Sequence, residues 1–241
     1  MWSNQIKRIH CIGVGGIGVS AVAEMLHVQG YTVSGSDCKQ SQTTTRLSDQ
    51  GIQIFIIHDA EHVKDSDLVV YSSAIADDNV ELLQAHKQGI PCIKRGEVLA
   101  QFFNQKHGVA VVGSHGKSTT TGMISRLLIE AAFDPVSVIG GVVQGLESPV
   151  RFGQGDFFVA EGDESDGSFL LLQPKVAVVT NIDNDHLDHY GNDYEILLSA
   201  FSDFLNSLPE DGVAILNVDD PGVNAILPSL RCRVLRYGSH A

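Results

Sequence analysis

The sequence predicts an α/β protein of two domains, each with a mostly parallel sheet covered by helices. Three observations support this prediction. Short apolar runs typical of buried strands alternate with stretches of helical periodicity. Two Gly-rich turns, each between a predicted strand and a predicted helix, lie about a hundred residues apart. At 241 residues with 43% hydrophobic residues, the chain can build two cores of ordinary size.

The N-terminal part alternates strands and helices up to a short polar segment at 105–108, where we place the domain boundary. The first domain therefore covers residues 1–105 and the second covers residues 106–241. Predicted strands of the first domain are 8–13, 32–36, 52–57, 68–71 and 91–93, and predicted helices are 18–30, 80–89 and 97–104.

The second domain begins again with a strand, a Gly-rich turn and a helix. After a strand at 234–237 the chain reaches Ala241 with no obvious closing helix and fewer strands than a doubly wound sheet needs. We therefore expect this domain to be incomplete. Its predicted strands are 109–112, 157–160, 176–180, 213–217 and 234–237, and its predicted helices are 119–132 and 195–208.

Composition excludes some classes of partner. The formal net charge is -13, from 29 acidic and 16 basic residues, and no Lys/Arg cluster is present. Long nucleic acids and anionic membrane surfaces are therefore not expected partners. The four cysteines are far apart, and the apolar segment before the first glycines is too short for a signal peptide or a membrane span. These features predict a cytoplasmic protein.

The first Gly-rich turn has the form G-x-G-x-x-G, with Gly13, Gly15, Gly16 and Gly18 after a strand and before a helix, and Asp37 follows nineteen residues after Gly18. In a Rossmann-like domain such a turn lets a diphosphate approach the helix N-terminus, and the acid can meet a ribose hydroxyl. The pattern indicates a diphosphate-containing nucleotide more firmly than NAD. The alternatives are glycines that only pack the helix onto the strand and an Asp37 that is an exposed strand-end acid.

The second turn predicts a phosphate-binding loop at the start of a P-loop-type α/β ATPase domain. Residues 113–119, Gly-Ser-His-Gly-Lys-Ser-Thr, join a buried strand to a helix. In such loops backbone N–H groups surround phosphate oxygens, a lysine such as Lys117 neutralises their charge, and a hydroxyl such as that of Ser118 holds Mg²⁺. The standard spacing requires a glycine six residues before the lysine, where this chain has Val111. The loop is therefore shorter or differently shaped.

Carboxylates and histidines follow two later strands. Glu161 follows the strand at 157–160, and His186 lies beyond the strand at 176–180. Because ligands of open α/β sheets bind outside the carboxyl ends of strands, we expect Glu161, His186 and the Lys117 loop to meet at one site. Glu161 suits Mg²⁺, whereas His186 suits a transition metal or a hydrogen-bonding role. The alternative is that these residues lie in solvated loops. The spacing does not show which of Asp163, Glu164 and Asp166 would take part in the site.

With these motifs in view, the whole chain resembles the Mur ligase family. Residues 113–121 resemble the family's ATP loop, with Ser114 and Ser118 where threonine is commoner. Residues 160–166, 168–170, 180–183 and 185–188 resemble the branch that adds L-alanine first. Several later-acting ligases carry a lysine fifteen residues after the metal-binding histidine, where this chain has Phe201. A relative that recycles murein tripeptide stays as the alternative within the family.

The resemblance implies a ligase that uses ATP and Mg²⁺ to join L-alanine to UDP-N-acetylmuramate. It implies Lys117, Glu161 and His186 as catalytic residues and Ser118, Glu161 and His186 as metal ligands. For ATP binding it implies Gly113, Ser114, His115, Gly116, Lys117, Ser118 and Thr119. For the UDP-sugar it implies Gly13, Gly15, Gly16, Ile17, Gly18, Asp37, Ser72, Ser73 and Ala74.

Three other functions stay open from the residues alone. A nicotinamide-dependent oxidoreductase would use Gly13 to Gly18 and Asp37 but leave the Lys117 loop idle. A small-molecule kinase or NTPase would use the loop but not the first domain. A non-catalytic UDP-sugar-binding fragment fits a chain that ends at Ala241, and we expect this chain alone to bind the UDP-substrate without ligation. A homo-oligomer is compatible with the sequence.

Overall fold

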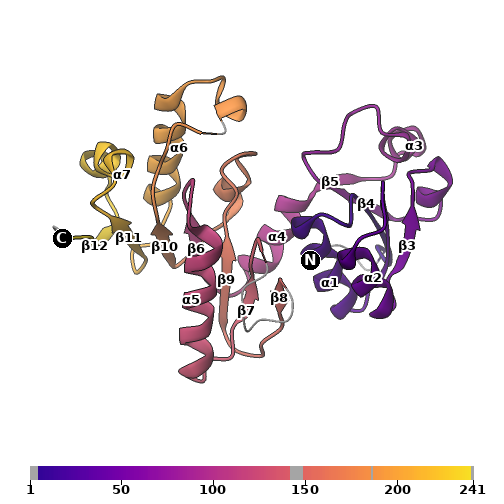
Figure 1. Cartoon of the computed structure of the whole chain (residues 1–241), viewed down its shortest axis with the longest axis horizontal. Coiled ribbons are helices and arrows are strands. Elements are labelled where there is room, and N and C mark those ends of the chain that lie inside the picture. Colours follow the sequence, from indigo (N-terminus) through magenta and orange to yellow (C-terminus); the bar gives the residue numbers. More distant parts are fainter. Residues whose placement is uncertain (1–4, 142–148, 186, 240–241) are drawn as a thin grey trace. The chain divides into compact units, whose positions relative to one another are not determined.

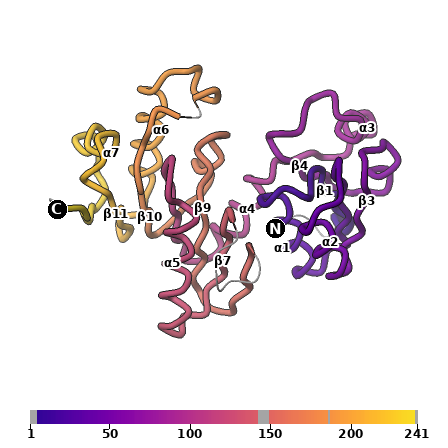
Figure 2. Tube along the Cα trace, viewed as in Figure 1, coloured from indigo at the N-terminus to yellow at the C-terminus, as the bar shows by residue number. Residues whose placement is uncertain are grey.

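The computed structural model describes residues 5–141, 149–185 and 187–239 and divides into two compact units, Met1–Leu99 and Ala100–Ala241. Figures 1 and 2 show the path of the chain through each unit. The division falls within a helix that precedes the polar segment 105–108. The domain boundary near residue 105 stays a prediction.

The N-terminal unit is a parallel α/β domain (Figure 1). Its five strands pair in the order β3-β2-β1-β4-β5, and every pair is parallel. The order reverses between β1 and β4, which is where ligands of doubly wound sheets bind. The elements are β1 (Arg8–Ile12), α1 (Ile17–Val28), β2 (Thr32–Asp37), α2 (Gln42–Asp49), β3 (Gln53–Ile56), the 3-10 helix η1 (Ala60–Val63), β4 (Leu68–Tyr71), α3 (Val80–Gln88), β5 (Cys92–Lys94) and α4 (Arg95–Phe103).

The apolar runs of the sequence become strands buried on both faces. Ile9, Cys11 and Ile12 of β1 are fully buried, as expected for a central strand of a parallel sheet. Burial raises the pKa of the Cys11 thiol to about 12, so this cysteine stays protonated near neutral pH. The predicted Rossmann-like domain is confirmed.

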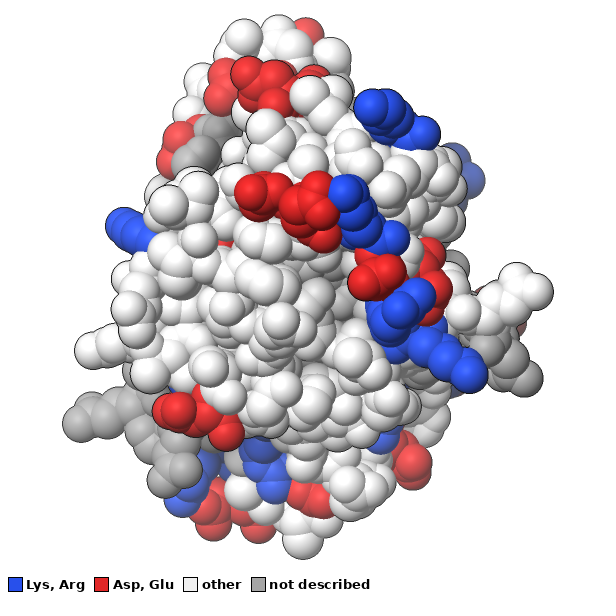
Figure 3. All heavy atoms as spheres, turned by 90° about the vertical axis from the view of Figure 1, so that its right-hand side faces the viewer, with Lys and Arg blue, Asp and Glu red and all other residues white. Residues whose placement is uncertain are grey.

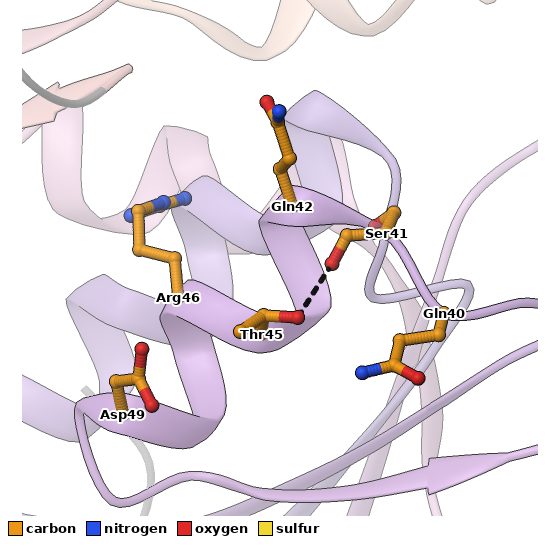
Figure 4. A pocket seen from close by; sticks show the side chains of 6 residues that line it. All are labelled: Gln40, Ser41, Gln42, Thr45, Arg46 and Asp49. Atoms are coloured by element: carbon orange, nitrogen blue, oxygen red, sulfur yellow. Dashed lines mark hydrogen bonds between the residues drawn. The ribbon is translucent and has the colours of Figure 1, made fainter.

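Helix α2 was not predicted, because only Thr44 and Leu47 of its residues are buried and its apolar signal is weak. Its start depends on local hydrogen bonds. The Ser41 hydroxyl accepts from the Thr44 N–H, and the Thr44 hydroxyl accepts from the Ser41 N–H, which forms a capping box. Figure 4 shows a further bond in this turn, from the Thr45 hydroxyl to the Ser41 carbonyl.

The first turn of α3 carries a buried carboxylate. Glu81 is fully buried and accepts hydrogen bonds from Nδ1 of His58 at 2.8 Å, Nδ1 of His62 at 2.7 Å and the Ser36 hydroxyl at 2.5 Å. His10, also fully buried, has its Nε2 atom 3.5 Å from Glu81 Oε1. We call His10, Ser36, His58, His62 and Glu81 the Glu81 network. It ties β1, β2 and α3 together through polar groups.

The C-terminal unit contains a mixed sheet with the order β12-β11-β10-β6-β9-β7-β8, in which only β7 and β8 pair antiparallel. The predicted mostly parallel sheet is thus confirmed, while β7, β8 and α7 are short elements that were not predicted. The elements are β6 (His107–Val112), α5 (Lys117–Glu130), β7 (Val136–Val138), β8 (Val150–Arg151), β9 (Phe157–Glu161), η2 (Ser168–Leu171), β10 (Val176–Val179), η3 (Leu187–Tyr190), α6 (Tyr194–Asn206), β11 (Val213–Asn217), α7 (Pro221–Ile226), η4 (Leu227–Ser229) and β12 (Arg233–Tyr237).

The central strand β6 sets the position of three loops of this unit. It pairs with β9 on one side and with β10 on the other. The three loops that follow β6, β9 and β10 therefore leave the same edge of the sheet side by side. These loops begin at Gly113, Gly162 and Thr180.

An aromatic cluster packs α6 onto the loop that follows β9. Phe169, Phe201 and Phe204 are buried, and the ring of Phe169 lies 5.1 Å from each of the other two. Phe201 and the segment containing Phe169 were both markers of the alanine-adding branch. Their direct contact gives a physical reason for the two markers to occur together.

Among the residues that the structure describes, none of the helices is long and apolar enough to cross a membrane. On the face of the N-terminal unit in Figure 3, Lys and Arg lie next to Asp and Glu around a broad uncharged area.

Candidate functional site

The first Gly-rich turn is held against the end of β2. The N–H groups of Gly13 and Val14 donate to the Ser36 carbonyl at 2.9 and 3.0 Å, and the Gly13 φ of 77° lies in the left-handed region. Gly15 N–H donates to the Asp37 carboxylate at 2.8 Å. Asp37 thus places a negative group at the turn that precedes α1, where an N–H group and the helix dipole favour an anion.

The residues after β4 lie beside this turn. A Cβ atom on Gly13 would lie 3.1 Å from the Ile75 side chain, and Ala74 N–H donates to the Ser72 hydroxyl at 3.2 Å. The structure therefore brings the turn, Asp37 and the 72–75 segment together at the switch point between β1 and β4. Gly16, Ile17 and Ser73 are exposed in this region, and Gly18 packs against the Arg95 side chain.

The 113–119 loop is fastened to the end of β10. Ser114 N–H donates to the Asn181 carbonyl at 3.2 Å, and His115 N–H donates to the Asn181 side-chain oxygen at 2.8 Å. The hydroxyl of Thr180 and the side-chain amide of Asn181 both donate to the His115 carbonyl, at 2.7 and 2.9 Å. Thr180 and Asn181 were absent from the predicted site residues, although they lie in a segment that carried the resemblance.

The loop ends in the N-terminus of α5. Gly116, at φ 80°, is the N-cap and has no side chain to bond the first N–H groups of the helix. Such groups and a helix dipole are able to bind an anion, and Lys117, Ser118 and Thr119 lie in the same first turn. His115 is exposed and pairs with Asp183, with 3.1 Å between Nε2 and Oδ2.

Gly113 should not tolerate a side chain. Its φ is +131°, and an added Cβ would lie 2.3 Å from the Thr180 hydroxyl and 2.6 Å from the Asn181 carbonyl. We expect Gly113→Ala to lower the free energy of unfolding by about 3 kcal/mol or more, from backbone strain and overpacking together. Chemical denaturation measures this change. The control is Gly89→Ala, where φ is +68° but space is open, with an expected cost of about 1–2 kcal/mol. Equal costs for the two variants would show that the contacts at Gly113 do not matter.

Two acidic side chains reach the loop, Glu161 from the last position of β9 and Glu164 from the segment after it. Ser118 donates to Oε2 of Glu161 at 3.1 Å, and Lys117 Nζ donates to Oε1 of Glu164 at 2.8 Å. Glu161 is partly exposed and also accepts from Gly140 N–H at 2.6 Å. Burial raises the pKa of the Glu161 carboxyl, and the hydrogen bonds from Gly140 and Ser118 only partly offset that effect. Glu164 is almost fully buried.

The oxygens of Ser118 and Glu161 fit a magnesium ion. A hydroxyl and a carboxylate are the hard oxygen ligands that Mg²⁺ takes beside phosphate oxygens, and here they lie within 3.1 Å of one another. The third predicted metal ligand, His186, lies outside the described residues. Among the described residues, no group of three or more His, Cys, Asp or Glu side chains is arranged to hold a metal.

A shallow pocket lies along α2 (Figure 4). All of its lining residues have polar or charged side chains, and none of them was a predicted site residue. It lies on the segment that follows Asp37 along the chain. The lining residues are Gln40, Ser41, Gln42, Thr45, Arg46 and Asp49.

The chain is similar to curated proteins that are longer than it is. UDP-N-acetylmuramate–L-alanine ligases from Syntrophotalea carbinolica and Pelobacter propionicus are 50% and 48% identical to it over 97% of its length. The chain spans about half the length of the curated relatives it matches, 51% in both of these.

The fold of the chain is similar to those of solved ligase structures. The crystal structure of UDP-N-acetylmuramate-alanine ligase from Thermotoga maritima matches 98% of this chain and 53% of its own, with a TM-score of 0.88 and 31% identity. A UDP-N-acetylmuramate:L-alanyl-gamma-D-glutamyl-meso-diaminopimelate ligase from Neisseria meningitides matches 96% of this chain and 78% of its own, with a TM-score of 0.89 and 26% identity.

The family patterns divide the chain as its two Gly-rich turns do. The pattern described as the Mur ligase family, catalytic domain, matches residues 8–107, and the Mur ligase middle domain matches residues 111–241. Because the second match alone covers more than half of the sequence, and the relatives share about half of their aligned residues with it, the chain belongs to the Mur ligase family.

Proposed function

We propose that this chain supplies the UDP-sugar-binding and ATP-binding parts of a ligase that joins L-alanine to UDP-N-acetylmuramate. The observation that carries the proposal is the phosphate loop, where Ser118 meets the carboxylate of Glu161 at the end of β9 and Lys117 meets that of Glu164 just after it. The names of the relatives, which are 48–50% identical over 97% of the chain, support the choice of alanine as the added amino acid.

In the C-terminal unit, residues 113–119 bind the phosphates of ATP. The N-terminus of α5 and Lys117 provide positive charge, and phosphoryl transfer depends chiefly on such positioning and charge neutralisation. Ser118 and Glu161 hold Mg²⁺, which neutralises charge on the phosphates when it is bound. The assignment of His186 to a metal rests on the family resemblance alone.

In the N-terminal unit, the turn from Gly13 to Gly18 binds the diphosphate of the UDP-sugar. Asp37 accepts the Gly15 N–H in the structure and lies at the carboxyl end of β2, where an acid can also meet a ribose hydroxyl. Ser72, Ser73 and Ala74 contribute from the end of β4, on the other side of the switch point.

The reaction begins when a carboxylate oxygen of the lactyl group attacks the γ-phosphorus of ATP. ADP leaves, and an acyl phosphate forms. The amine of L-alanine then attacks the acyl carbon, and the tetrahedral intermediate expels inorganic phosphate and loses a proton to leave the amide. Lys117 acts in the first step, where negative charge gathers on the transferred phosphoryl group.

A murein peptide ligase is the second candidate, because the Neisseria meningitides structure has nearly the same TM-score as the alanine ligase structure. The residues of this chain favour alanine. Its 165–170 segment, Ser-Asp-Gly-Ser-Phe-Leu, and Phe201 have the form of the alanine-adding branch, and Phe169 contacts Phe201.

Two measurements test the proposal. In thermal unfolding of this chain, we expect UDP-N-acetylmuramate and Mg·ATP each to raise the midpoint, and NADH to have no effect, since ligands stabilise the state that they bind. In the full-length natural protein, phosphate release should require both UDP-N-acetylmuramate and L-alanine. Release with the tripeptide but not with alanine would favour the second candidate, and stabilisation by NADH alone would contradict both.

A further inference from the structure

Lys117 uses all of its hydrogen-bonding capacity within the C-terminal unit. Its ammonium group donates to the Gly113 carbonyl at 2.5 Å, the Ser114 carbonyl at 3.3 Å and Glu164 Oε1 at 2.8 Å. An ammonium has three N–H donors and no acceptor. Lys117 therefore has to release one of these three oxygens before it can donate to a phosphate.

Glu164 is the partner whose loss would be most unfavourable. Its side chain is only 4% exposed, and Oε2 is buried without a hydrogen-bond partner among the residues that the structure describes. If Lys117 left, the carboxylate would remain buried with no partner on either oxygen. A buried charge that loses its partner is destabilised far more than a neutral carbonyl that loses one hydrogen bond.

The Ser114 carbonyl is the partner most easily released. Its hydrogen bond is the longest of the three, and Ser114 is partly exposed, so that water can replace the lysine. Exchange at this position frees one N–H of Lys117 and keeps the ion pair with Glu164 intact.

The backbone of Glu164 is also fixed from outside the loop. The hydroxyl of Tyr190 donates to the Glu164 carbonyl at 2.6 Å, and Gly167 N–H donates to the same carbonyl at 3.2 Å. Tyr190 is itself buried. These bonds, which come from η3 and from the turn after Glu164, hold the carboxylate at one position behind the phosphate loop.

We propose that Glu164 is a positioning residue that stays paired with Lys117 when Mg·ATP binds and sets the place of the ammonium against the transferred phosphoryl group. The inference rests on the proposed function, because it requires ATP at the 113–119 loop. The two acids that reach the loop thus have different roles. Glu161 faces Ser118 and the metal position, whereas Glu164 acts only through Lys117.

The first test observes the ammonium directly in this chain. Hydrogen bonds to a buried carboxylate slow proton exchange, so the ¹⁵N–¹H signal of the Lys117 ammonium should be detectable by NMR. We expect the signal to move and to persist when Mg·ATP is added, because the ion pair remains. Loss of a signal seen without nucleotide would mean that Lys117 leaves Glu164, and would overturn the inference.

The second test uses Glu164→Gln, which keeps the size of the side chain and removes its charge. We expect kcat of the full-length natural protein to fall roughly 10- to 100-fold, because a misplacement of about 1 Å can reduce a rate about 10²-fold. The dissociation constant for Mg·ATP should stay within about 3-fold, since the loop and the metal ligands are intact. A matched control is Glu210→Gln, which removes the same charge at an exposed position of the same unit and should change neither quantity.

The outcomes are distinct. Binding that becomes 10-fold tighter with unchanged kcat would show that Glu164 restrains Lys117 in the free state, and unchanged kcat and binding would show no role; either result overturns the inference. If Glu164→Gln does not fold, the inference is still tested by the NMR signal of the unaltered chain with and without Mg·ATP. Wild-type protein that binds Mg·ATP but forms no amide would refute the proposed ligase activity, while the ammonium signal would still test the role of Glu164.

Discussion

Lys117→Ala is expected to reduce ATP-dependent ligation by the full-length natural protein on the order of 10³-fold or more, because single cationic groups that stabilise phosphoryl transfer contribute about 10³- to 10⁵-fold. The loss should fall mainly on kcat. Lys117 is the first residue of α5, and its ammonium donates to the Gly113 carbonyl of the 113–119 loop, the position that this role requires. Steady-state phosphate release with saturating UDP-N-acetylmuramate and L-alanine measures the effect.

Removal of Lys117 also removes the partner of buried Glu164, so that a loss of activity has to be separated from unfolding. Turnover is therefore normalised to the folded fraction, and Lys117→Met, which keeps most of the side-chain volume, serves as a second variant. The control is Lys175→Ala, which breaks a surface ion pair with Asp211 and should leave turnover unchanged. Wild-type turnover in a folded Lys117 variant would contradict the ATP-loop assignment.

Loss of the Glu81 carboxylate should destabilise the N-terminal unit strongly. We expect Glu81→Ala to lower the free energy of unfolding by about 3–5 kcal/mol, the range found when one partner of a buried charged pair is removed. The physical reason is that His58, His62 and Ser36 all donate to this carboxylate in a fully buried place. Urea denaturation followed by circular dichroism at pH 7 measures the change.

The Glu81 carboxylate should also make the free energy of unfolding depend on pH. Burial by itself raises the pKa of Glu81, but hydrogen bonds from His10 and Ser36 outweigh it, and the pKa falls from 4.5 to about 2. Because the folded pKa is the lower one, the stabilisation is complete above the unfolded value and is lost as pH falls from about 4.5 towards 2. The shift corresponds to about 3 kcal/mol at 1.36 kcal/mol per unit.

Glu81→Gln should therefore differ most from the wild type near pH 7, and the two should approach each other near pH 3. The control is Glu61→Gln, because Glu61 is exposed and pairs only with its neighbour Lys64 among the ion pairs of the described residues. We expect that control to change stability by no more than about 0.5 kcal/mol. A difference between Glu81→Gln and wild type that is the same at both pH values would contradict the depressed pKa.

Strong local patterns were sufficient for the main elements of the fold. The run around Ile9 and Cys11 became a strand buried on both faces, and each Gly-rich turn opened a helix where expected. Helix α2 was missed because its start depends on the hydrogen bonds of Ser41 and Thr44 rather than on an apolar period. Strands β7 and β8 were missed because two or three residues are too few to show alternation.

The residues of the candidate site were likewise only partly predictable from the sequence. Lys117, Ser118 and Glu161 were recognisable from residue type and from their place after buried strands, and the structure brings all three to one edge of the sheet. Glu164 was one of several acids in a run, and spacing does not show which carboxylate turns inward. Asn181 holds the loop through contacts between residues 66 positions apart, which no local pattern reports.

By itself the sequence determined the α/β class, the two Gly-rich turns and the family, because glycine conformation, apolar periodicity and motif spacing are local properties of the chain. Only the tertiary structure decided which polar groups are buried together. His10, Ser36 and Glu81 come from β1, β2 and α3, and His58 and His62 come from the connection between β3 and β4. The Lys117–Glu164 pair joins α5 to the loop after β9. Such pairings depend on strand order and burial, since charge and solvent access are set only when distant segments pack against each other.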